Sequence, residues 1–458
     1  HMFSIFNSPK YLFKLLILLV VVGFIQSCSK DQPLPESQET ETYSAKHLTD
    51  FYSLVCKITK NTPGFFPPQA ARAYGYISIA NYEAVRNGIE NAVSLNTQLN
   101  GFSNYPLPTP NADAEYNWAI ASNAAVAKMM IYMYDKNLKN EDRLKIQDLE
   151  SANLSLLSSN VSQDIIERSI AYGKSVADVI YDYSKTDGGH ESYLAPFQLP
   201  YTVPNDPHCW VPTSATLNPL SPKWGSNRPF LANNITKVQP TMPVAFSIEK
   251  SSEFYKEAMF VYNTVQNNSS EQIEIAKYWA DDPFATCTPT GHTFAILTQI
   301  LQEERVTLSK ASVAYARMGI AENDAFIACW KGKYDYLLIR PVSYIQRYID
   351  PSFKTVIGTP PFPAYTSGHS CEMGAGSRIL TDLFTEGSGD YPFTDYSQLQ
   401  FGFAARSFRN FDQLAEECAK SRLYGGIHYT FDNDKGLIVG KAIGDNVNKE
   451  IKWPLFIR

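Results

Sequence analysis

The chain has 458 residues, 44% of them hydrophobic, and a formal net charge of −6. This length provides for a sizeable core in one large or two medium domains. The acidic balance and the lack of long basic runs argue against a nucleic-acid partner.

The N-terminal segment has the organisation of an export signal. Two lysines precede an apolar run over 15–25, which is too short for a comfortable membrane span and ends at small residues. Cys28 follows directly, as in bacterial lipoprotein signals; the alternative is an ordinary secretory signal with an incidental cysteine. We expect a signal peptide over 1–27 and a lipid on Cys28 that tethers an exported domain to the outer membrane or cell surface. The polar segment 28–46 is predicted to be a disordered tether.

Helical periodicity dominates the body of the chain and predicts an all-α, multi-helix fold. Apolar residues recur at three- and four-residue spacing, strand-like alternation is scarce, and no repeat is evident. We therefore expect one large α-helical domain over 47–458, with Asn111 or Asp113, Asn140 and Ser162 as helix caps. The expected helices are 49–60, 69–89, 112–136, 141–157, 163–184, 253–265, 270–279, 293–304 and 310–329.

Residues 185–248 interrupt this pattern. The segment contains Gly188-Gly189, many prolines, and the tryptophans Trp210 and Trp224. Irregular stretches of this length are uncommon unless they are functional. We expect the segment to cover an active-site mouth or to form a subunit contact; the alternative is a surface crossover between two helical halves.

The cysteines give no sign of a metal site. Their spacings match neither a dense disulfide framework nor a Cys-x-x-Cys pair, so a buried free thiol is expected for most of them. Apart from Cys28, the cysteines are Cys56, Cys209, Cys287, Cys329, Cys371 and Cys418.

Three short stretches in the last third of the chain carry the charged groups. Lys333 and Arg340 stand seven positions apart, and a proline follows the arginine. Arg422 supplies a third cation further along the chain. Guanidinium forks match the oxygens of a tetrahedral anion and an ammonium acts as a point charge. The set therefore predicts a binding site for an oxyanion such as phosphate or vanadate.

The same stretches supply two histidines with suitable partners. Ser367 and Gly368 read as a tight turn opening a helix, where backbone N–H groups and the positive helix end would face the anion. His369 would be an acid–base group. His428 and Asp432 are four residues apart, hence on one face if the segment is helical, and the carboxylate would then fix the imidazole tautomer.

Taken together, these stretches resemble a known superfamily. The patterns Lys-x6-Arg-Pro, Pro-Ser-Gly-His and Ser-Arg-x5-His-x3-Asp are typical of vanadium-dependent haloperoxidases and type 2 phosphatidic acid phosphatases. All three match in order and spacing, except that Thr366 stands where the family usually has proline. Further similarity covers the Ala-rich helix near Ala70, the Trp279 to His292 segment and Trp330. The resemblance implies two four-helix bundles with long irregular loops and a site segment over 330–445.

The resemblance also implies a cofactor and roles for the site residues. His428 would be the single protein ligand to vanadium, and Asp432 would support it. His369 would help deprotonate hydrogen peroxide, and Lys333 would polarise it, so that a halide, iodide or bromide, is oxidised. The residues implied to hold vanadate are Lys333, Arg340, Ser367, Gly368, His369, Arg422 and His428.

Two alternatives remain open. In a phosphatase of the same superfamily, His428 would attack phosphorus to form a phospho-histidine, and His369 would protonate the leaving group. In a third class, the chain is a lipid-anchored binding protein without chemistry, although such proteins typically show helical repeats. The haloperoxidase interpretation is favoured because the chain is longer than compact phosphatases need and shows no multiple membrane spans. The halide, the organic acceptor and the oligomeric state are not fixed by the sequence.

Four further residues near these stretches have both a functional and a structural interpretation. Trp330 either lines a substrate pocket or belongs to the core. His292, at a helix start, is more often a structural hydrogen-bonding group than a ligand. Asp324 is expected to be a buried, hydrogen-bonded residue, and Glu417 to be either a partner of a site cation or a solvated side chain.

Overall fold

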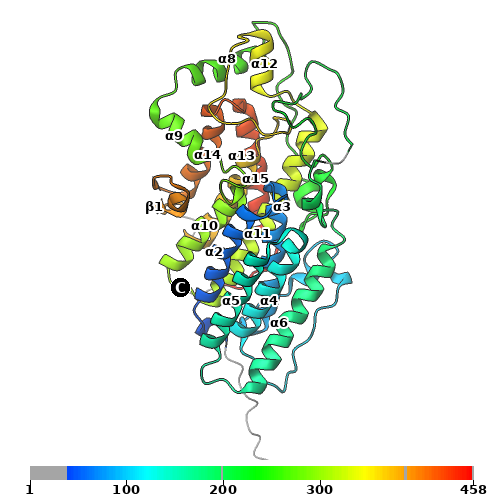
Figure 1. The fold of residues 1–458 in the computed structure, drawn as a ribbon, viewed down its shortest axis with the longest axis vertical. Helices are drawn as coiled ribbons and strands as arrows, with labels where there is room; N and C mark the ends of the chain where they lie inside the picture. Colours follow the sequence, from blue (N-terminus) through cyan, green and yellow to red (C-terminus); the bar gives the residue numbers. More distant parts are fainter. Residues whose placement is uncertain (1–38, 198–199, 386–388, 456–458) are drawn as a thin grey trace, which may run out of the picture. The chain divides into compact units, whose positions relative to one another are not determined.

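The computed structural model describes residues 39–197, 200–385 and 389–455. The predicted signal peptide, Cys28 and most of the predicted tether lie outside these residues. The described part contains fourteen α-helices and a single two-stranded sheet, which confirms the all-α prediction (Figure 1). None of the described helices combines the length and the apolar character that a bilayer span requires.

Each predicted helix is present; the one over 163–184 has the predicted bounds, and the ends of the others are displaced by up to seven residues. The N-terminal helices are α2 (Lys46–Asn61), α3 (Pro67–Val85), α4 (Trp118–Tyr134), α5 (Asn140–Leu157), α6 (Gln163–Ser184) and α7 (Asn233–Thr236). The C-terminal helices are α8 (Glu253–Gln266), α9 (Ser270–Tyr278), α10 (Thr288–Glu303), α11 (Leu308–Tyr336), α12 (Pro341–Tyr348), α13 (Gly368–Phe384), α14 (Phe411–Tyr424) and α15 (Thr430–Glu450). The strands β1 (Phe393–Asp395) and β2 (Arg406–Phe408) pair antiparallel.

Of the predicted helix caps, Ser162 is an N-cap residue and the others are not. Asn117 caps α4, its Oδ1 accepting from the N–H of Ile120 at 3.0 Å, in place of the expected Asn111 or Asp113. Asn140 lies inside α5 rather than before it. Ser162 does precede α6, but its hydroxyl donates to a neighbouring carboxylate and caps no backbone N–H. Several polar residues compete for each cap, and periodicity alone does not choose between them.

Close helix contacts bring the motif-bearing segments together. In Figure 1, α4, α5 and α6 lie side by side at one end, α3 and α11 run through the centre, and α13 and α15 follow beyond them. A Cβ on Gly440 of α15 would lie 2.0 Å from the carbonyl oxygen of Cys371 in α13, so only glycine permits this contact. Gly75 of α3 and Gly319 of α11 meet in the same way, as expected for the Ala-rich early helix.

The packed region begins earlier than predicted. Thr40 is buried in a short 3-10 turn, donates its hydroxyl to the carbonyl of Gly88 at 2.7 Å, and accepts from Ser309 at 2.6 Å. Lys46 opens α2. The prediction of a disordered tether is therefore wrong for its last residues, 39–46, because polar side chains there bind the core.

The irregular segment 185–248 is anchored across α11. The carboxylate of Asp324 accepts hydrogen bonds from the backbone N–H groups of Phe230 and Leu231 at 2.8 and 2.9 Å. Asp324 is therefore the buried, hydrogen-bonded helix residue that was expected. The indole N–H of Trp330 donates to the carbonyl of Leu220 at 3.2 Å, which brings this segment to the cavity described below.

One disulfide, Cys56–Cys287, joins α2 to the residue before α10 across 231 residues of sequence. The other four cysteines within the described residues are buried free thiols, in agreement with the expectation for most of them.

Replacing both Cys56 and Cys287 by serine is expected to lower the free energy of unfolding by about 2–4 kcal/mol, because the unfolded chain loses a long covalent loop. Denaturant titration under non-reducing conditions measures the change. Cys209→Ser is the matched control, since Cys209 is a buried free thiol. An equal loss in both proteins would contradict a stabilising bridge.

Candidate active site

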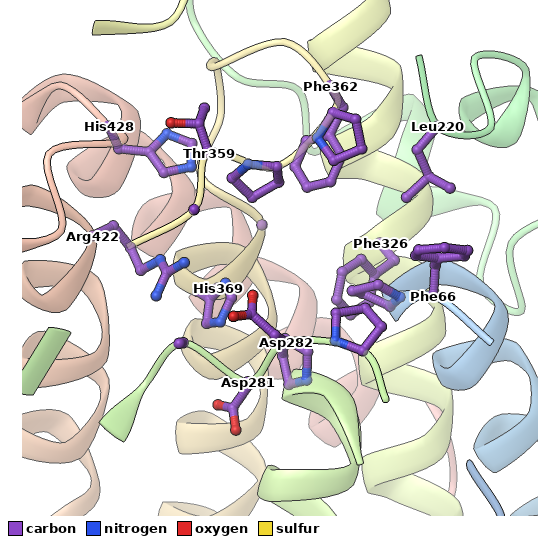
Figure 2. Close-up of a pocket in the computed structure, with 18 of the residues that line it drawn as sticks. Phe66, Leu220, Asp281, Asp282, Phe326, Thr359, Phe362, His369, Arg422 and His428 are labelled. Atoms are coloured by element: carbon purple, nitrogen blue, oxygen red, sulfur yellow. The ribbon is translucent and has the colours of Figure 1, made fainter. Parts of the chain in front are cut away.

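A cavity of about 220 Å³ opens beside the N-terminus of α13. Its inner end carries polar groups, and its walls are mainly aromatic and proline side chains. Figure 2 shows His428, Arg422 and His369 turned toward the same space, with the carboxylate of Asp282 beside the His369 ring. The walls include Phe66, Leu220, Phe326, Trp330, Thr359 and Phe362.

His428 lies in the turn before α15, so the helical arrangement considered for His428 and Asp432 does not apply. Asp432 is the third residue of α15, and its Oδ2 accepts hydrogen bonds from the Nδ1–H of His428 at 2.9 Å and from the N–H of Tyr429 at 3.1 Å. The four-residue spacing therefore works through a helix-capping turn. The predicted pairing of imidazole and carboxylate is present, with a different local geometry.

The second ring nitrogen of His428 faces a guanidinium group. Its Nε2 lies 3.0 Å from Nη1 of Arg340. Arg340 is fully buried, and it also donates to the carbonyls of Phe362 and Ile427, both at 2.8 Å. Burial, together with Arg340 and other nearby cations, holds the pKa of His428 well below its usual value. His428 is thus a neutral imidazole with its proton on Nδ1 and a lone pair on Nε2.

The ammonium group of Lys333 is held by the backbone next to the site. Its ammonium group donates to the carbonyls of Pro363, Ala364 and Thr366 at 2.9, 3.1 and 2.5 Å, which uses all its N–H groups. Lys333 does not line the cavity. Burial lowers its pKa to about 8. In this structure Lys333 therefore holds the turn that precedes α13. Its positive charge acts on the site through this turn rather than by lining the cavity.

The Ser367-Gly368-His369 turn opens α13, as the sequence predicted. Ser367 is the N-cap, its Oγ accepting from the N–H of Ser370 at 3.4 Å. Gly368 and His369 line the cavity, so the positive end of the helix faces it. The Ser367 hydroxyl is engaged in this cap rather than directed at the cavity.

His369 is held by backbone and remains neutral. Burial and the charge of Arg422 keep its pKa well below the usual value, although hydrogen bonds to the backbone of Trp279 and Ala280 partly oppose this shift. Its Nε2 is buried and has no partner in the described structure. A neutral ring with a free nitrogen can accept a proton from a bound molecule.

The inner end of the cavity fits an oxyanion. Arg422 donates from Nη1 to the carbonyl of Trp279 at 2.7 Å, while its Nε, like Nη2 of Arg340, is buried without a partner among the described residues. Burial lowers the pKa of both guanidinium groups. Buried donors without partners are rare, and an anion with several oxygens would satisfy them. Among the described residues, no cluster of His, Cys, Asp or Glu is suited to holding a metal cation.

Several wall residues were missed by sequence reasoning. Asp282 and Phe362 line the cavity, as do Gly358 and Thr359. The run Gly-Thr-Pro-Pro-Phe-Pro over 358–363 lies just before the Ser-Gly-His turn, and such a stiff segment could have been recognised as a site loop. Trp330 lines the cavity, which was one of its two expected places.

Glu417 lies outside the cavity, where it accepts from Arg406 at 2.7 Å and from the indole N–H of Trp279 at 3.0 Å. Of the two interpretations left open for Glu417, the structure shows a side chain partnered by a cation, Arg406, which is not one of the predicted site residues.

Comparison with known proteins relates this site to a family. The profile of the VCPO second helical-bundle domain matches residues 313–454. Vanadium chloroperoxidase from Curvularia inaequalis is 24% identical over 505 aligned positions, covering 87% of this chain and 81% of the relative. Vanadium-dependent bromoperoxidase from Ascophyllum nodosum is 35% identical over 95 residues, or 19% of this chain.

Solved structures agree. The crystal structure described as the first bacterial vanadium-dependent iodoperoxidase superposes with a TM-score of 0.81 at 32% identity, covering 91% of this chain and 99% of that one. A holo-type bacterial vanadium-dependent chloroperoxidase shares the fold, with a TM-score of 0.64 at 14% identity over 93% of this chain and 96% of that one. The motifs, the site and these similarities together show that the chain belongs to the vanadium-dependent haloperoxidase family.

Proposed function

We propose that this protein oxidises a halide with hydrogen peroxide, using vanadate bound at the inner end of the cavity. The observation that carries the proposal is the neutral His428, whose Nε2 faces the guanidinium group of Arg340, together with two buried donors, Nη2 of Arg340 and Nε of Arg422, that have no partner among the described residues. Bound vanadate supplies Lewis-acid activation of the peroxide.

The chain's own groups would bind and orient the reactants. Arg340, Arg422 and the backbone N–H of Gly368 would bind the vanadate oxygens, and Nε2 of His428 would be the single protein ligand to vanadium. Asp432 keeps the proton of His428 on Nδ1, so the Nε2 lone pair stays available. His369 Nε2 would accept a proton from hydrogen peroxide.

Iodide is the proposed halide. The similar solved structure at 32% identity is described as an iodoperoxidase, whereas the relatives with lower identity or coverage are chloro- and bromoperoxidases. Iodide is also the most easily oxidised common halide. The aromatic and proline walls leave room for a small organic acceptor next to the site.

The proposal is tested with purified protein incubated with orthovanadate. We expect peroxide-dependent formation of triiodide from iodide, slower oxidation of bromide, and no turnover when vanadate is omitted. A parallel assay of p-nitrophenyl phosphate hydrolysis without vanadate measures the phosphatase alternative. Robust ester hydrolysis together with no halide oxidation would reverse the assignment.

For localisation, the proposal is a lipid on Cys28 that tethers the exported domain to the bacterial envelope. It rests on the order of lysines, apolar run and cysteine in the sequence. Expression in a bacterial host with labelled palmitate should give a labelled protein, and Cys28→Ser should remove the label. A wild-type protein without label would contradict the proposed lipid anchor and would not affect the proposed enzymatic function.

A further inference from the structure

A fully buried histidine lies between two carboxylates behind the cavity. His292, the fifth residue of α10, places Nδ1 2.9 Å from Asp281 and Nε2 2.9 Å from Asp395. His292 is 0% exposed, and it lies outside the cavity lining. We call these three residues the histidine clamp.

The clamp is a charged unit with every ring donor satisfied. Burial opposes a charge on His292, but the two carboxylates outweigh it and raise its pKa to about 10. The carboxylates are held in turn, since Asp395 accepts from the hydroxyl of Tyr278 at 2.5 Å and Asp281 accepts from the amide of Gln398 at 3.1 Å. Such a network fixes the orientation of its members.

The clamp holds the segment 279–282, which touches two site residues. The indole of Trp279 stacks on the His292 ring, with centroids 4.6 Å apart. The carbonyl of Trp279 accepts from Nη1 of Arg422 at 2.7 Å. The backbone of the same segment hydrogen-bonds the ring of His369.

The side chains of the two adjacent aspartates in this segment point in different directions. Both residues line the cavity, but the carboxylate of Asp281 is bound in the clamp, while that of Asp282 lies next to His369. Figure 2 shows the Asp281 carboxylate pointing away from the cavity and the Asp282 carboxylate pointing toward it. A rotation of the segment would therefore move the groups that contact His369 and Arg422 together.

We propose that the histidine clamp is a positioning device for the anion site, with His292 as a positioning residue that sets His369 and Arg422 through the backbone of 279–282. The clamp also gives a function to the β1–β2 hairpin, because Asp395 ends β1 and reaches His292 across 103 residues of sequence. This inference rests on the proposed function, since it concerns the same oxyanion site.

The test compares wild type with Asp395→Ala and His292→Phe, and measures binding of orthovanadate and of inorganic phosphate by calorimetry. Both variants are expected to bind about tenfold more weakly, as is typical when an outer-shell partner is lost. Asp395→Asn keeps an oxygen that can accept from Nε2 and should recover part of the affinity. In ¹⁵N-histidine NMR of the wild type at pH 8, His292 should carry protons on both ring nitrogens.

Asp187→Ala is the matched stability control. Asp187 is equally buried, is paired with Arg72 at 2.7 Å, and lies outside the cavity lining. It should lower the melting temperature without changing either affinity. Unchanged affinities in Asp395→Ala, His292→Phe and Asp395→Asn would overturn the clamp's role alone. A wild-type protein that binds neither anion would overturn the proposed function, and the clamp's role with it.

Discussion

Replacing His428 by alanine is expected to abolish halide oxidation, because the variant loses the imidazole nitrogen that faces the guanidinium group of Arg340. Loss of an outer-shell partner at such sites costs about 10- to 100-fold in affinity or activity, and loss of the ligand itself should cost more. Vanadium retained after dialysis and initial rates with iodide both measure the effect. Since His428 is buried, circular dichroism must first show that the variant is folded.

The control for this variant is His208→Ala. His208 has a side chain that is 41% exposed, its ring hydrogen-bonds the nearby Asp206 and Cys209, and it does not line the cavity. It should retain wild-type vanadium content and rate. If a folded His428→Ala protein still oxidises iodide at the wild-type rate, His428 has no part in the mechanism.

Asp432→Asn is expected to produce the second largest loss, about 10- to 100-fold in vanadate affinity. The carboxylate accepts from both His428 and the N–H of Tyr429 through one oxygen, and an amide retains one acceptor oxygen but no charge. The proton of His428 is then less firmly held on Nδ1, and the Nε2 lone pair is less available. Affinity is measured by titrating orthovanadate into the purified variant.

A double variant distinguishes whether Asp432 acts through His428 or independently of it. If Asp432 acts through the histidine, adding Asp432→Asn to His428→Ala should cause little further loss. Asp434→Asn is the control, because Asp434 lies two residues further along α15 and is exposed. Fully additive losses would show that Asp432 contributes by a route other than His428.

Helical periodicity and motif spacing carried most of the sequence-based prediction. The apolar spacing located the helices, because amphipathic faces are local features of a chain. The motifs located His369, Arg422 and His428, which line the same cavity, and Arg340, whose Nη1 lies 3.0 Å from Nε2 of His428.

The local geometry of the site was not predictable in the same way. Lys333 was expected to face the anion, but the carbonyls of the turn 363–366 compete for its ammonium group. The sequence left open whether His428 lies on a helix, and the capping turn that binds Asp432 places it before the helix. In both cases backbone groups determine where the side chain lies. The spacing of residues in the sequence does not show which carbonyls are free to accept a hydrogen bond or which residue caps a helix.

The histidine clamp shows a different limit. His292 was noted as a lone histidine at a helix start, for which a structural interpretation is the usual one. Its partner Asp395 lies in a three-residue strand far along the chain, with no periodic pattern to mark it. Only the tertiary fold shows that both ring nitrogens meet carboxylates.

The most direct test of the oxyanion site is anomalous X-ray diffraction from crystals soaked in orthovanadate. The site described above predicts one vanadium peak at the inner end of the cavity, adjacent to Nε2 of His428 and between the side chains of Arg340 and Arg422. A vanadium peak elsewhere, or no peak in a soaked crystal of intact protein, would contradict it.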